Sequence, residues 1–286
     1  MTFPSDIGVI DLMLQIPGED PREWYEFMQP LFMDDASRNY KKMPAEYMFR
    51  NVPDLEPQAD PVAYTLGKLD QFNIAKAMIG IQHPTSQEAV RRYPDRFFGS
   101  WHANPNRGMD EVRAIIRAKE EFNIKAVTAF PSGLCPQVPI NDAKWYPIYA
   151  KCVELDLPFV CTVGVPGPRL PMAPQKVELI DEVCWFFPEL KFVMRHGAEP
   201  WEELAVKLML KYDNLFYSTS AFAPMHYPKA IIDFANTRGS KKIMYAGYWP
   251  MGLSLERIFS ELPQVPFRDH VWPRFLRDNA LEVFKL

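Results

Sequence analysis

The segment VIDLMLQIP at residues 9–17 begins with an apolar run that is typical of a buried β-strand. Seven more short apolar runs follow along the chain, separated by amphipathic segments whose apolar residues lie three and four positions apart. The predicted strands are 7–13, 75–82, 97–103, 124–130, 158–164, 191–196, 214–220 and 242–247, and the clearest helices are 109–122, 142–155, 173–187, 201–212 and 227–238. Eight βα units in 286 residues predict an α/β fold, a (β/α)8 TIM barrel, with a doubly wound sheet as the alternative.

The segment 16–62 interrupts this alternation. It is rich in Pro, Met, Tyr and Trp and carries no strand pattern. Because it follows the first strand directly, a barrel would place it over the mouth formed by the βα loops, where active sites of this fold lie. We therefore predict one domain over residues 1–286, with a helical lid at 16–62. An insertion on the outside of the barrel or at a dimer contact is the alternative.

Composition favours a small-molecule partner. The net charge of -4 and the sequence pI near 5.8 predict no basic face for nucleic acid or an anionic membrane. The four cysteines show no CxxC spacing, and the chain has neither a signal-peptide pattern nor about 18 consecutive apolar residues. We expect a cytoplasmic protein with reduced thiols, without membrane contact, and with a homo-oligomer as a possible state.

Several motifs resemble the amidohydrolase-related family of decarboxylases and hydrolases. The resemblance spans nearly the whole chain and implies the barrel fold, but it specifies no substrate. The motifs are YTLGKLDQFNIAKAMIGI (64–81), RYPDRFFGSWHANP (92–105), NDAKWYPIYAKCVELDLPFVCTVG (141–164), PELKFVMRHGAEPW (188–201), KKIMYAGYWP (241–250) and RDNALEVFKL (277–286).

The chain departs from this family where the family binds its metal. The first strand of the family carries two metal-binding histidines after an aspartate; here Asp11 is kept, but Met13 and Gln15 follow it. The metal-binding histidine of the fifth strand falls on Thr162, and the aspartate of the eighth falls on Tyr248. A thioether, an amide, a hydroxyl and a phenol suit a divalent cation poorly. The comparison therefore implies a barrel without the family's metal and without another cofactor.

One reactive position of the family is retained. The resemblance implies that His196, in the His-Gly motif of the sixth strand, acts as acid or base, a role that suits a side chain titrating near neutral pH. Arg195 is the expected clamp for a substrate carboxylate, and Glu199 is expected to orient His196 or to share proton transfer. Adjacent strand residues face opposite ways, so one member of the Arg195–His196 pair must turn at the loop. The alternatives are a structural histidine, and an ion pair between Arg195 and Glu199 or a helix carboxylate.

Other polar residues are expected near the strand ends. The predicted substrate-binding residues are Gln15, His83, His102, Thr162 and Tyr248, with a loop or capping role as the alternative for the two histidines. Hydroxyls of Ser218, Ser220 and Tyr245 would add to them, Asp11 is expected deep in the barrel, His226 and His270 on the surface, and Cys135 is a weak candidate nucleophile. An atypical metal site made of His83, His102 and His196 stays open.

Two classes of function fit these observations. The first is a metal-independent hydrolase or C–C lyase, of lactonase or decarboxylase type, that acts on a small carboxylated cyclic or aromatic compound. In that enzyme, hydrogen bonds from Gln15, Thr162 or Tyr248 would stabilise developing negative charge. The second is a non-catalytic barrel that binds a ligand or a partner subunit. Retention of His196 favours the enzyme.

Overall fold

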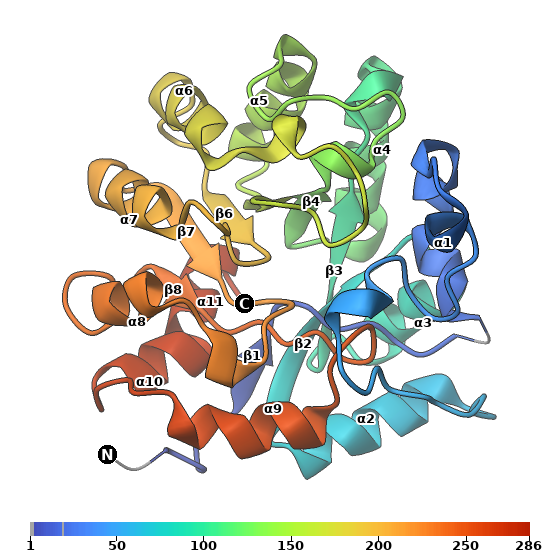
Figure 1. The fold of residues 1–286 in the computed structure, drawn as a ribbon, viewed down its shortest axis with the longest axis vertical. Coiled ribbons are helices and arrows are strands. Elements are labelled where there is room, and N and C mark those ends of the chain that lie inside the picture. The colour runs from blue at the N-terminus through green and yellow to red at the C-terminus, as the bar shows by residue number, and fades with distance from the viewer. Residues whose placement is uncertain (1–2, 19) are drawn as a thin grey trace.

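Eight parallel strands form one closed barrel (Figure 1). The computed structural model describes residues 3–18 and 20–286. The strands are β1 (Val9–Asp11), β2 (Ile74–Gly80), β3 (Phe97–His102), β4 (Ala126–Ala129), β5 (Phe159–Thr162), β6 (Phe192–Arg195), β7 (Leu215–Ser218) and β8 (Ile243–Met244). Each strand pairs with the next in sequence, and a parallel bridge between Leu14 and Trp249 joins the two ends of the sheet. The predicted TIM barrel is confirmed, and every predicted strand lies at its expected place.

Helices surround the strands on the outside of the barrel (Figure 1). They are α2 (Pro61–Gln71), α3 (Pro84–Arg92), α4 (Met109–Phe122), α5 (Tyr146–Glu154), α6 (Ile180–Phe186), α7 (Glu202–Lys211), α8 (Lys229–Ala235), α9 (Leu255–Glu261), α10 (Val271–Pro273) and α11 (Asn279–Phe284). The predicted helix 109–122 matches α4, whereas 142–155 and 173–187 begin with short 3-10 turns before α5 and α6. Within residues 3–18 and 20–286, no helix is both long and apolar enough to span a membrane.

The barrel interior changes from apolar to polar along β5 and β6. On β5 and β6, Val160 and Val193 belong to an apolar cluster that also contains Phe284 of α11, so α11 packs at the amino-terminal end of the strands. Two residues further along, Thr162 and Arg195 are buried and line a cavity. Side chains alternate between the two faces of a strand, so both pairs point inward. Polar groups therefore gather at the carboxyl end of the barrel, where its enzymes place their sites.

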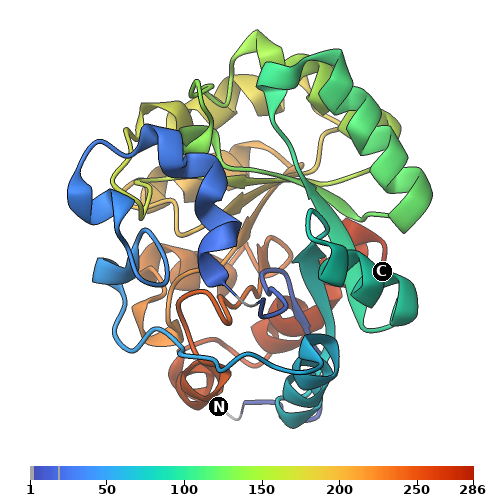
Figure 2. The same cartoon turned by 90° about the vertical axis from the view of Figure 1, so that its right-hand side faces the viewer.

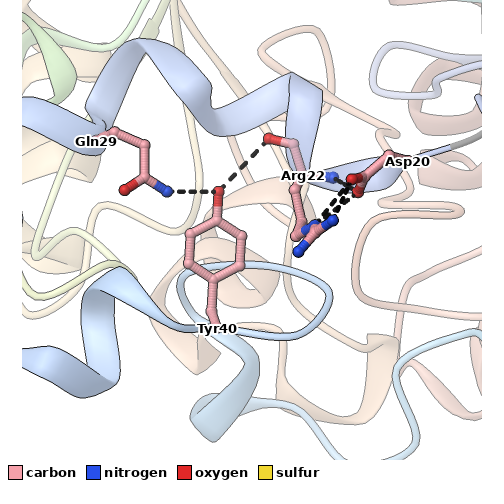
Figure 3. Close-up of polar contacts among 4 residues, drawn as sticks. All are labelled: Asp20, Arg22, Gln29 and Tyr40. Carbon is pink, nitrogen blue, oxygen red and sulfur yellow. Dashed lines mark hydrogen bonds and ion pairs between the residues drawn. The ribbon is translucent and has the colours of Figure 1, made fainter.

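The insertion after β1 consists of short helical turns. They are η1 (Pro21–Leu31), α1 (Asp35–Arg38) and η2 (Glu46–Met48). Figure 2 shows this segment in blue on the left, on the side away from the C-terminus. Asp20 accepts a hydrogen bond from the Arg22 backbone N–H and pairs with its guanidinium, and the Tyr40 hydroxyl contacts Gln29 Nε2 at 3.4 Å and the Arg22 carbonyl at 3.5 Å (Figure 3). These contacts hold the insertion together; its role as a lid stays a prediction.

Candidate functional site

A cavity of about 1100 Å³ opens at the carboxyl ends of the strands. The barrel contributes its inner end, which we call the floor, and the insertion contributes much of its upper wall. The floor residues are Met13, Gln15, Ser100, His102, Thr128, Thr162, Arg195, His196 and Tyr248. The insertion residues are Trp24, Tyr25, Phe27, Met28, Met43, Met48 and Phe49. All eight residues predicted for catalysis or substrate binding line this one cavity.

Arg195 is a buried cation without a carboxylate partner. It ends β6 and is 8% exposed. Its Nε donates to Thr162 Oγ1 at 3.1 Å, and its Nη1 lies 3.6 Å from Met13 Sδ. Burial lowers the pKa of Arg195 to about 10, so the side chain stays charged at neutral pH. None of the ion pairs among the described residues includes it, so its remaining N–H groups are available to an anion in the cavity.

His196 faces the same cavity because the chain turns sharply after β6. His196, Gly197 and Ala198 have φ values of +66°, +89° and +60°. Three consecutive left-handed residues break the alternation of the strand, which lets two neighbouring side chains line one cavity. Gly197 is required here, because a Cβ at this position would lie 2.2 Å from the ring of Phe222. The predicted turn within the Arg195–His196 pair is thereby explained.

Ser220 holds the ring of His196. Its Oγ lies 3.1 Å from Nδ1 and accepts the backbone N–H of His196 at 3.3 Å. This leaves Nε2 for the cavity. The orienting contact expected from Glu199 is therefore supplied by Ser220, while Glu199 lies exposed at the cavity margin.

Two histidines at the floor are neutral. Burial, reinforced by the charge of Arg195, lowers the pKa of His196 to about 3 and that of His102 to about 4. His102 Nδ1 lies 3.3 Å from Thr128 Oγ1, and its buried Nε2 has no hydrogen-bond partner among residues 3–18 and 20–286. The expectation that His196 titrates near neutral pH is thus wrong, because a desolvated ring beside a guanidinium disfavours a second positive charge.

The remaining candidates divide between the cavity and other places. His83 lines the cavity and also caps α3, since its Nδ1 accepts the Thr85 N–H at 3.3 Å. Asp11 is fully buried, but its neighbours Ile10 and Leu12, not Asp11, belong to the apolar cluster inside the barrel. Its Oδ1 accepts the N–H groups of Met13 and Gly247, and burial raises its pKa to about 7. Away from the cavity lie Ser218 and Tyr245, which are buried, Cys135, which is exposed, and His270, which is also exposed.

Sequence reasoning missed the side chains that the insertion adds. Phe27 packs against the ring of His102 at 5.2 Å, and Phe49 stacks on Tyr248 at 5.6 Å. His226, expected on the surface, is exposed but lines the cavity margin. The aromatic content of 16–62 indicated a role for the segment, yet nothing in its irregular pattern identified which rings face inward.

The family is established by comparison. A family model described as Amidohydrolase matches residues 13–286. The chain belongs to the amidohydrolase family. No curated protein matches the sequence.

Solved structures of similar fold include other barrels at low sequence identity. One is an uncharacterised TIM-barrel protein from Bordetella bronchiseptica, with a TM-score of 0.73 and 19% identity over 97% of this chain and 98% of that chain. A second is 5-carboxyvanillate decarboxylase from Novosphingobium aromaticivorans with bound manganese, with a TM-score of 0.69 and 15% identity over 99% and 98%. A third is dihydroxybenzoic acid decarboxylase from Polaromonas with bound manganese, with a TM-score of 0.67 and 15% identity over 98% and 97%.

The cavity of this amidohydrolase family member does not fit a divalent metal. The described part of the chain contains no group of three or more His, Cys, Asp or Glu side chains placed to hold an ion. Met13 and Thr162, at two positions where the family binds its metal, instead contact the guanidinium of Arg195. A fixed positive charge among these residues repels a second cation. The chemistry of the site has to be derived from its side chains.

Proposed function

We propose that this protein is a metal-independent decarboxylase or hydrolase of small carboxylated aromatic compounds, with decarboxylation as its first candidate reaction. The observation that carries the proposal is the buried, unpaired guanidinium of Arg195 beside His196 at the cavity floor. A buried charge without a partner is costly, and a substrate anion would supply the partner. The decarboxylases of similar fold act on aromatic acids, which supports this substrate class.

In the proposed complex, Arg195 binds the substrate carboxylate and His196 moves the proton. A carboxylate on Arg195 offsets the positive charge that helps to depress the pKa of His196, so binding makes this imidazole a better proton carrier. His196 takes a proton from water and delivers it to the ring carbon. The bond from that carbon to the carboxyl group breaks, its electron pair stays on the ring carbon, and carbon dioxide leaves. The net reaction consumes one proton.

Neutral hydrogen-bonding groups at the floor complete the proposed site. Thr162 orients the guanidinium through its hydroxyl, and the Tyr248 ring lies edge-on to His196 at 5.5 Å. Gln15 and Tyr248 line the same floor and are the proposed donors to negative charge on the substrate. The same arrangement suits hydrolysis of a lactone or an activated ester, in which the oxyanion would develop beside Arg195.

The test is turnover by chelator-treated protein. A panel of hydroxybenzoates, carboxyvanillate and aromatic lactones is assayed for release of carbon dioxide and for ester opening, with and without added Mn²⁺ or Zn²⁺. We expect turnover without metal, a loss of at least a hundredfold in His196→Gln, and little change in His226→Gln, a control histidine at the cavity margin. Activity that appears only with added metal would refute the proposal.

A non-catalytic binding barrel is the second candidate. It is favoured by the pKa of about 3 for His196, which makes the free imidazole a weak base. If acids bind in an Arg195-dependent manner and none is turned over, this second function replaces the first.

A further inference from the structure

The cavity is much larger than a single-ring acid requires. An engineered cavity of about 150 Å³ accommodates benzene, and ligand pockets of roughly 300–1,000 Å³ hold drug-sized molecules. The cavity here, at about 1100 Å³, exceeds that range. A benzoate with its carboxylate on Arg195 would leave most of the upper volume to water.

The wall above the floor continues as aromatic surface for more than one ring. From His196 it runs to Tyr248, with ring centroids 5.5 Å apart, and from Tyr248 to Phe49, with centroids 5.6 Å apart and planes at 26°. Phe49 and Tyr248 also close around Gly252, whose added Cβ would lie within 3.0 Å of both rings. The stacking surface therefore reaches from the barrel floor to the insertion.

The upper part of this wall is apolar and adaptable. It consists of Met48, Phe49, Met251 and Leu253 together with the ring of the floor residue Tyr248; we call these five residues the apolar chamber. Methionine side chains adapt their shape to a ligand and make favourable contacts with aromatic rings.

The five chamber side chains are uncharged, and of the two arginines beside the chamber that also line the cavity, Arg50 is exposed. Arg257 pairs with Glu261 at 2.8 Å. The chamber therefore suits an uncharged ring better than a second carboxylate.

We propose that the substrate of this site is an aromatic acid that carries a second, uncharged ring, with its carboxylate on Arg195 and the second ring in the apolar chamber. This inference rests on the proposed function, since it uses Arg195 as the carboxylate clamp. It adds the size and polarity of the substrate beyond the first ring.

Calorimetric titration with two matched probes tests the inference. The probes are 4-hydroxybenzoate and 4′-hydroxybiphenyl-4-carboxylate, which share the carboxylate and differ by one ring. Burial of about 100 Å² of additional apolar surface at roughly 25 cal/mol per Å² predicts ten- to hundredfold tighter binding of the two-ring acid. Equal or weaker binding of the two-ring acid overturns the inference.

Substitutions in the insertion locate the second ring. Phe49→Ala and Met48→Ala should weaken binding of the two-ring acid at least fivefold and leave the one-ring acid within twofold. Met33→Ala is the matched control, because Met33 is another methionine of the insertion, 82% exposed and outside the cavity. If Met33→Ala has the same effect as Met48→Ala, the chamber assignment is wrong.

The two proposals fail in different ways. If the one-ring acid binds and Arg195→Met abolishes its binding, but the second ring adds nothing, only the inference about substrate size is overturned. If neither acid binds, or if binding does not depend on Arg195, the carboxylate clamp and the inference built on it both fall.

Discussion

Replacing Arg195 by methionine should stabilise the protein while removing its ligand. Burial lowers the pKa of Arg195 from its usual value above 12 to about 10. The folded state thus holds this proton less tightly than the unfolded state does, by between two and three pH units. At 1.36 kcal/mol for each unit, the charged side chain destabilises the folded protein by about 3 kcal/mol.

Two other consequences of the substitution are small. The hydrogen bond to Thr162, at 3.1 Å, contributes about 1 kcal/mol. The shortened side chain leaves its space to the cavity, so no closed void forms in the core. The expected net effect is a gain of about 2 kcal/mol in the free energy of unfolding, or a rise of about 4 °C in Tm, together with the loss of carboxylate binding.

Urea unfolding at pH 7 measures the stability, and calorimetric titration with an aromatic carboxylate measures binding. Arg257→Met is the matched control, because Arg257 also lines the cavity but pairs with Glu261, which is largely buried. That substitution should destabilise the protein. A destabilisation of more than about 1 kcal/mol in Arg195→Met would show that the guanidinium serves the fold, and the reasoning about an unpaired charge would be refuted.

Three further predictions concern the floor and the turn after β6. The pKa of His196 is lowered to about 3, so only the unfolded state takes up a proton on this ring as the pH falls from about 6.5. His196→Gln should therefore lose less stability than the parent protein between pH 6.5 and 4 in urea titrations. An unchanged slope of the unfolding free energy against pH would contradict the burial of a neutral ring. The pKa of Asp11 is raised to about 7, so its ionisation costs stability as the pH rises from about 4 to 7. Asp11→Asn should therefore flatten the dependence of the unfolding free energy on pH in this range. A dependence identical to that of the parent protein would count against this prediction. Gly197→Ala should lower stability by more than about 2 kcal/mol and displace His196, because its Cβ would lie 2.2 Å from Phe222. The control Gly67→Ala in α2, where no atom lies within 4 Å of the added Cβ, should stabilise the protein by about 0.5–1 kcal/mol. Thermal unfolding that ranks the two variants the other way would refute the argument.

The fold could be predicted because its signals are local. Each strand is a short apolar run bounded by loop residues, and each major helix carries its own periodicity, as α4 shows over Met109–Phe122. The segments that the sequence predicts less well, such as 173–187, begin with 3-10 turns whose spacing differs from that of an α-helix.

The site depends on contacts that the sequence does not encode locally. Thr162 and Arg195 meet because β5 and β6 pair at that register, and Ser220 contacts His196 from the loop that follows β7. The motif identified His196, but its pKa depends on desolvation and on Arg195, which only the packed structure determines. The insertion lacks a regular period, so its inward-facing rings could not be assigned.

The methionines of the cavity make its upper wall sensitive to oxidants. Met48 is 57% exposed and Met251 lines the same apolar chamber. Peroxide converts such thioethers to sulfoxides, which are polar and bulkier. Mild oxidation would therefore turn an apolar surface into a polar one without breaking a strand or a helix, and methionine sulfoxide reductase would restore it.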